Sequence, residues 1–179
     1  TSWQLSPMAR ADSGIKTIAD FAGKRVMPVK ANGTTHVMWR DLFTAAGVAE
    51  DKIEWSFGSW TETYGAMKKG AVDVIPVLLT NGRPSGRVSD LEASGVKMRI
   101  LDIPNSAFDA VKSKNPGILR STVQPSDNTT KFVTEPTSMV TLAGIVGANY
   151  APYVLWSEHP TAWSWVCLCV FHVLVANLL

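Results

Sequence analysis

The sequence predicts an α/β protein in which a mainly parallel sheet is flanked by helices. Strand and helix patterns alternate from about residue 14 to residue 104, as in chains whose parallel strands are joined by right-handed helical crossovers. With 46% hydrophobic and 18% charged residues among 179, the composition is that of a globular chain. We expect strands at residues 24–29, 53–57, 72–79 and 97–103.

Glycines and one capping motif mark the boundaries of the expected helices. The helix from Thr34 to Ala46 ends at Gly47, a residue type that readily adopts the left-handed conformation after a helix C-terminus. Its apolar stripe at helical spacing contains Thr35, Met38, Trp39, Leu42, Phe43 and Ala46. Ser59 and Glu62 have the spacing of a capping box and open the next helix. Further helices are expected at residues 17–22, 87–94 and 105–114.

Two stretches depart from the simple alternation. The strand at residues 72–79 is the most apolar, so we expect it to be the most buried. Pro76 inside it has no N–H to donate, so one side of that strand is expected to be an edge or to carry a bulge. After Pro104 the alternation stops: residues 121–130 are polar and turn-rich, and residues 131–146 are expected to be extended.

Composition and motifs argue against several classes of function. The net charge of +2 is small, and no basic stripe with interleaved aromatic residues suggests a nucleic-acid partner. The three histidines are far apart in the sequence, and no cluster has metal-ligand spacing. No nucleophile elbow or phosphate-binding loop is present. We therefore predict a binding protein that is not an enzyme and needs no catalytic residue, metal or cofactor.

The candidate ligand site is the turn formed by Asn32, Gly33, Thr34 and Thr35. It lies between an apolar strand and an amphipathic helix, so unpaired backbone N–H groups and two hydroxyls are expected to point at one spot. Such a turn suits a carboxylate, a phosphate or another small anion. The alternative is a helix N-cap that only satisfies its own helix.

Two further loops are expected at the same sheet edge, where ligands bind in open α/β sheets. One contributes Ser59, Trp60 and Thr61, and the other contributes Thr80 and Asn81. Trp60 either covers a ligand face or packs as the first apolar residue of its helix.

The aromatic and imidazole side chains near this edge have separate expected roles. Trp39 and Trp55 are expected in the core, because each falls on the apolar side of its element. His36, in the first turn of its helix, is expected to be a solvated neighbour of the site.

The order of motifs resembles the solute receptors of TAXI-type TRAP transporters. Residues Ser13–Val26 read Ser-Gly-Ile-Lys-Thr-Ile-Ala-Asp-Phe-Ala-Gly-Lys-Arg-Val, similar to the segment that opens the second lobe of these receptors. The turn Ala31–Thr34 resembles the Gly-Ser-Gly-Thr turn of the family, although Ala31 and Asn32 replace its first two residues. The helix ends in Ala45–Gly47, and Ala66–Val74 resembles a further family stretch.

The resemblance implies a two-lobed periplasmic receptor with the type II periplasmic-binding fold. Such a receptor closes on a small organic acid, such as glutamate or a dicarboxylate, and delivers it to the permease subunits of a membrane transporter. By this match Gly33, Thr34 and Thr35 would grip a ligand carboxylate. The alternative is a ligand-sensing regulatory module with the same fold.

The resemblance also suggests how the chain is divided. Residues 1–12 would be the end of a truncated first-lobe strand, 13–104 the second lobe, and 105–149 a return segment towards the first lobe, which is largely missing. The isolated chain should therefore bind weakly, because such sites close between two lobes.

The remaining residues, 150–179, do not match the family. They contain Cys167 and Cys169 and carry no Asp, Glu, Lys or Arg after Glu158. A membrane span, a buried helix and a translation out of the natural frame are the three interpretations of this apolar tail.

Overall fold

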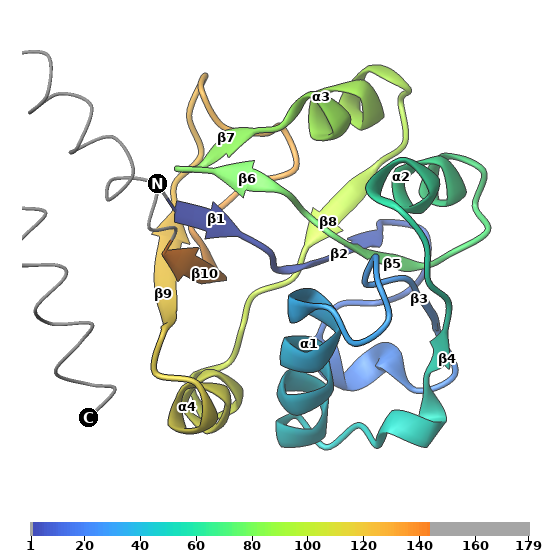
Figure 1. Ribbon diagram of the computed structural model, residues 1–179. Helices are drawn as coiled ribbons and strands as arrows, with labels where there is room; N and C mark the ends of the chain where they lie inside the picture. The colour runs from blue at the N-terminus through green and yellow to red at the C-terminus, as the bar shows by residue number, and fades with distance from the viewer. Residues whose placement is uncertain (1, 144–179) are drawn as a thin grey trace, which may run out of the picture. The chain divides into compact units, whose positions relative to one another are not determined.

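Two sheets and four α-helices make up residues 2–143 of the computed structural model, the part of the chain that the structure describes (Figure 1). The α/β class predicted from the sequence is confirmed. Within this part, no helix is long and apolar enough to cross a membrane. The apolar tail at 150–179, with its possible membrane span and both cysteines, lies outside the described residues.

Sheet B contains the strands that the sequence predicted. In spatial order these are β4 (Glu54–Trp55), β3 (Arg25–Val26), β5 (Val74–Pro76), β2 (Pro7–Arg10) and β8 (Met98–Ile100). Strand β3 pairs in parallel with β4 and β5. Strand β2 lies between β5 and β8 and pairs antiparallel with both, so β5 and β8 point the same way.

Sheet A is entirely antiparallel. Its spatial order is β7 (Arg83–Pro84), β6 (Leu79–Thr80), β1 (Ser2–Gln4), β10 (Thr137–Ala143) and β9 (Ile118–Val123). Strands β9 and β10 pair over six residues, from Thr137 opposite Val123 to Leu142 opposite Ile118. Part of the region expected to be polar turns, residues 121–130, is therefore the end of a strand.

The prediction of a mainly parallel sheet is wrong, and strand β2 explains part of the difference. The four strands alternating with helices do share one direction, as crossover geometry requires. Strand β2 precedes the first helix and needs no crossover, so it can enter the same sheet in the opposite direction. Sheet A, which the sequence did not reveal as a separate sheet, adds only antiparallel pairs.

The expected strand at residues 72–79 is divided between the two sheets. Pro76 ends β5 opposite Pro7 of β2, and the chain then passes into β6 of sheet A. A second passage, between β1 and β2, lies beside it, because the Val77 N–H donates to the Ser6 carbonyl at 3.0 Å. Two facing prolines cannot extend a ladder, so the sheet stops where the chain changes sheets.

The helices agree closely with the sequence analysis. They are α1 (Thr34–Ala45), α2 (Trp60–Lys68), α3 (Gly86–Ala93) and α4 (Asn105–Lys114), with short 3₁₀ helices η1 (Ile18–Phe21) and η2 (Glu50–Lys52). The stripe predicted on α1 is buried except for the half-buried Ala46 that follows the helix. Gly47 has a φ of 85°, which only glycine adopts at little cost.

The helices cover the two faces of both sheets. One core lies against α1 and α4, and the other against α2 and α3. Successive strand residues alternate between the cores: Ala9 and Val74 belong to the first, whereas Met8 and Ile75 belong to the second. In Figure 1, α1 and α4 lie below the sheets and α2 and α3 above them. A connection of residues 27–33 leads from the end of β3 to the start of α1.

Candidate functional site

The turn between β3 and α1 has an unusual backbone. Val29 and Asn32 have positive φ values of 78° and 54°, and a β-branched residue such as Val29 rarely adopts this conformation. The Gly33 N–H donates to the Lys30 carbonyl at 3.1 Å, and a Cβ on Gly33 would lie 3.1 Å from that same oxygen. The positive φ values store strain in the turn, and a side chain at Gly33 would force the Lys30 carbonyl to shift by a few tenths of an ångström.

Helix α1 begins with backbone donors that nothing in the described chain uses. Gly33 is the N-cap and provides no side-chain cap, and the first turn contains no acidic residue. The first helical bond is made by the Val37 N–H to the Gly33 carbonyl, at 3.0 Å. Within residues 2–143, the backbone N–H groups of Thr34, Thr35 and His36 have no acceptor. Three donors and the positive helix end make a cradle for an anion.

The loop after β4 lies against this turn. The Gly58 N–H donates to the Val29 carbonyl at 2.7 Å, so the carboxyl ends of β3 and β4 are joined. Phe57 remains 42% exposed and its ring centroid lies 4.8 Å from that of His36. An apolar side chain therefore stands beside the turn.

The start of α2 differs from that of α1 because a carboxylate of the helix itself, that of Glu62, accepts a hydrogen bond there. The Ser59 hydroxyl accepts from the Glu62 N–H at 3.2 Å, and the Glu62 carboxylate accepts from the Ser59 N–H at 2.7 Å, which confirms the predicted capping box. Thr61 is exposed, whereas Trp60 is half-buried and packs against both cores. Trp60 therefore packs against both cores with part of its side chain accessible, and its role as cover for a ligand stays a prediction.

The third expected loop lies in the other sheet. Asn81 forms the tight turn between β6 and β7 of sheet A, with φ values of 50° there and 79° at Gly82. Its side-chain carbonyl accepts from the Ser2 N–H at 2.9 Å, and Thr80 pairs with Trp3. Because the chain leaves sheet B after Pro76, this loop does not share a sheet edge with the other two.

The expectation that His36 is solvated is wrong. The side chain is 6% exposed, and its Nδ1 accepts a hydrogen bond from the Asn32 N–H at 3.0 Å. Burial, and then the Arg40 guanidinium, lower the pKa of His36 below its ordinary 6.5, while Glu50 acts in the opposite direction. Trp39 is fully buried as predicted, whereas Trp55 is half-buried. The burial of His36 could have been predicted from the sequence, because this residue lies beside Thr35 at the edge of the apolar stripe of α1.

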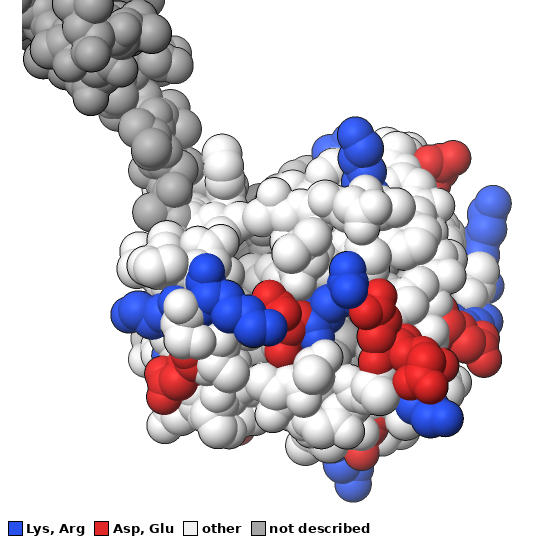
Figure 2. All heavy atoms as spheres, turned by 60° about the horizontal axis from the view of Figure 1, so that its bottom comes forward, with Lys and Arg blue, Asp and Glu red and all other residues white. Residues whose placement is uncertain are grey.

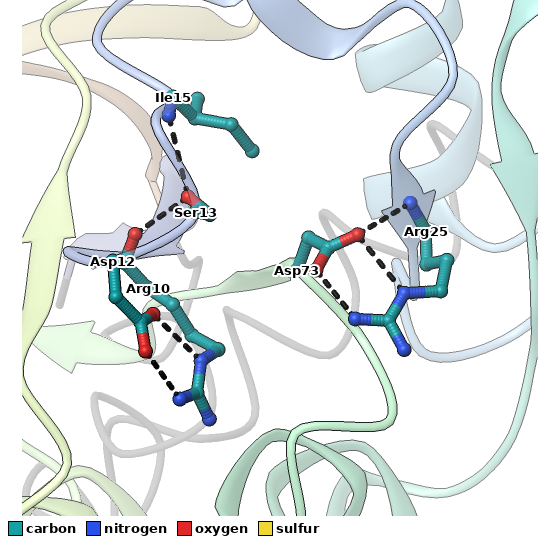
Figure 3. A network of polar contacts seen from close by, with 6 residues as sticks. All are labelled: Arg10, Asp12, Ser13, Ile15, Arg25 and Asp73. Atoms are coloured by element: carbon teal, nitrogen blue, oxygen red, sulfur yellow. Dashed lines mark hydrogen bonds and ion pairs between the residues drawn. The ribbon is translucent and has the colours of Figure 1, made fainter.

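Ionic side chains gather at the opposite ends of the same strands. The Arg25 guanidinium contacts the Asp73 carboxylate at 2.6 and 3.0 Å, and the carboxylate also accepts from the Arg25 N–H (Figure 3). Arg10 and Asp12 form a second pair at 2.7 Å. Arg25 opens β3, and Asp73 immediately precedes β5. The Arg25–Asp73 pair joins the start of β3 to the start of β5, whereas Arg10 and Asp12 pair within one segment.

The surface carries both charges. In Figure 2 a band of basic and acidic side chains crosses the face turned to the viewer, with the two signs meeting along it. Ion pairs of the described chain show the same mixing, such as Arg40 with Glu50 at 2.8 Å and Lys114 with Asp41 at 2.5 Å. Residues 2–143 contain no group of three or more His, Cys, Asp or Glu side chains that could hold a metal ion.

A donor-rich turn at the end of a parallel strand defines this as a candidate anion-binding α/β protein. Comparison with known proteins then gives its family. The model of the NMT1-like family matches residues 3–144, and the chain belongs to this family.

Solved structures of binding proteins show similarity to the chain at low sequence identity. The periplasmic aliphatic sulphonate binding protein SsuA from Escherichia coli is 14% identical, with a TM-score of 0.47, 84% of this chain covered and 40% of that chain. The alkanesulfonate-binding protein SsuA from Xanthomonas axonopodis pv. citri, bound to MOPS, is 15% identical, with a TM-score of 0.45 and coverages of 88% and 45%. The substrate binding protein of an amino acid ABC transporter is 15% identical, with a TM-score of 0.40 and coverages of 82% and 48%. The chain spans less than half the length of each.

Proposed function

We propose that this chain is part of a solute receptor of a TAXI-type TRAP transporter, which captures a small organic acid in the periplasm. Gly33, Thr34 and Thr35 grip a carboxylate of the ligand, with glutamate and dicarboxylates as the expected class. The receptor then delivers the acid to the permease subunits in the membrane. In this proposal residues 13–104 are the second lobe, and a first lobe would close over the turn.

The observation that carries the proposal is the uncapped start of α1. Three N–H donors after the carboxyl end of β3 have no acceptor in the described part of the chain, and the first turn has no acidic residue of its own. Helix α3 also begins without a side-chain cap, but it follows an edge strand of sheet A. Only α1, among the described helices, combines free donors with a strained turn after a parallel strand. The order of the family-like motifs supports the same site.

Nuclear magnetic resonance titration of the chain tests this proposal, because it detects the weak binding expected of a single lobe. The probes are L-glutamate and succinate, with L-arginine as a cationic comparison. We expect amide shift changes centred on Gly33 to His36 with the two acids and much smaller ones with arginine. Shift changes that are absent, or that centre on another surface, would contradict the assignment of the site.

The transport role needs a separate measurement in cells. Deleting the gene should abolish uptake of the acid that binds, and that uptake should depend on an ion gradient and not on ATP. Uptake that is unchanged by the deletion would leave a binding protein with another role, such as the sensing module.

A further inference from the structure

A buried imidazole contacts the turn that presents the α1 donors. We propose that neutral His36 holds the Asn32–Gly33 turn in its ligand-binding conformation, so that protonation of this ring weakens anion binding at the α1 N-terminus. His36 is a positioning residue in this proposal, because its side chain acts through the turn. The effect on affinity rests on the proposed function, whereas the holding role concerns the turn alone.

The hydrogen bond fixes which form of the imidazole is present. The Asn32 N–H is a donor and lies 3.0 Å from His36 Nδ1, so Nδ1 must carry a free electron pair. The ring proton is therefore on Nε2 in the neutral form. A doubly protonated ring would place an N–H against the Asn32 N–H, and two donors cannot bond to each other.

The surroundings of the ring favour the neutral form. Its centroid lies 4.9 Å from that of Trp55 and 4.8 Å from that of Phe57, both at steep interplanar angles. His36 Nε2 is buried and has no hydrogen-bond partner among the described residues. The charged groups on neighbouring elements are Arg40 of α1 and Glu50 of η2, which pair with each other. Among residues 2–143, no acidic side chain is bonded to the ring to stabilise its charge.

The turn needs this support because its backbone is strained. Asn32 has a φ of 54°, and Val29, three residues earlier, has a φ of 78°. Left-handed conformations of residues other than glycine persist only when surrounding contacts over-determine them. The contacts that do so here are the bond to His36 Nδ1, the Gly33 bond to the Lys30 carbonyl and the Gly58 bond to the Val29 carbonyl. Protonation removes the only one of these that involves a side chain.

Two variants of His36 distinguish the contribution of the Nδ1 hydrogen-bond acceptor from that of the packing of the ring. In His36→Asn the side-chain oxygen can take the place of Nδ1, whereas in His36→Gln the polar end of the side chain reaches the place of Nε2. Both lose the ring contacts, so His36→Gln is the control for loss of packing. The measurements are the ¹⁵N shifts of the imidazole, the amide shift of Asn32, and the Kd values for L-glutamate and for methanesulfonate. Methanesulfonate is included because its charge stays constant over the pH range.

In the natural sequence we expect the Nε2–H tautomer, an Asn32 amide shift that follows the titration of His36, and a Kd that rises roughly tenfold when the ring is protonated. His36→Asn should bind as the natural chain does at neutral pH and lose the pH dependence, and His36→Gln should bind roughly tenfold more weakly throughout. An Asn32 amide that ignores the titration of His36, or equal binding by the two variants, would overturn the proposal. If the amide follows His36 but neither anion binds at any pH, the holding role stands and the proposed function fails.

Discussion

Replacing Thr34 by proline removes one donor of the proposed cradle while keeping the helix. Thr34 is the first residue of α1, a position where proline is favoured because its missing N–H has no partner within the helix. Gly33 before it has φ −75° and ψ 167°, an extended conformation that a following proline allows. The folded structure should therefore tolerate Thr34→Pro, and any loss of binding reports on the Thr34 N–H together with the Thr34 hydroxyl, which the substitution also removes.

The expected size of the loss follows from the chemistry of the bond. A hydrogen bond to a charged group contributes about 1.5–3 kcal/mol. Because about 1.4 kcal/mol corresponds to a tenfold change in affinity, the Kd for L-glutamate should rise roughly ten- to a hundredfold. Thermal stability should stay within about 1 kcal/mol, since proline also restricts the unfolded chain.

Gly86→Pro is the matched control. Gly86 is the first residue of α3, whose N-terminus also lacks a side-chain cap, and Ser85 before it is extended at φ −71° and ψ 162°. A Cβ at Gly86 meets nothing within 4 Å. We expect Gly86→Pro to leave the glutamate shifts at α1 unchanged. If Thr34→Pro binds as the natural chain does, or if both variants lose binding equally, the α1 donors do not form the site.

Three further predictions concern stability. The hydrogen-bonded Arg25 guanidinium lowers the pKa of Asp73 below its ordinary 3.8, so the pair stabilises the fold above that pH and loses this effect as the pH falls through the lowered pKa. Asp73→Asn should therefore lower the free energy of unfolding by about 1 kcal/mol at neutral pH and by little in acid, as measured by urea unfolding. Tyr64→Phe leaves the Leu78 N–H, now 3.2 Å from the Tyr64 hydroxyl, without its acceptor and should cost about 1–3 kcal/mol in the same assay. Ser59→Ala removes the cap of α2 and should cost about 1 kcal/mol, seen as a lower Tm; an unchanged Tm would contradict the role of the capping box.

The helices were predictable because their signals are local. The stripe on α1, Gly47 after it and the box at Ser59 each act within a few residues of the sequence. The boundaries of α4 at Asn105 and Lys114 agree with the expected range for the same reason.

The sheets were less predictable because pairing joins distant residues. An apolar run such as residues 72–79 reads as one strand, and nothing within it states that its two halves pair with different partners. The antiparallel entry of β2 depends on where β8 lies, about ninety residues later. The loop at Thr80 and Asn81 was placed on the wrong sheet for this reason.

The sequence by itself determined the α/β class, the helices and the turn before α1 at Gly33, because periodicity, caps and glycines act over short distances. It also carried the motif order that suggests a solute receptor. Only the tertiary structure decided which loops meet, that Ser59 and Glu62 satisfy each other, and that His36 is buried against the turn. Those outcomes depend on the packing of β4 beside β3 and on a hydrogen bond whose strength comes from exclusion of water. The donors of the candidate site thus come from one short segment of the sequence, whereas the contacts that hold this segment come from residues elsewhere in the fold.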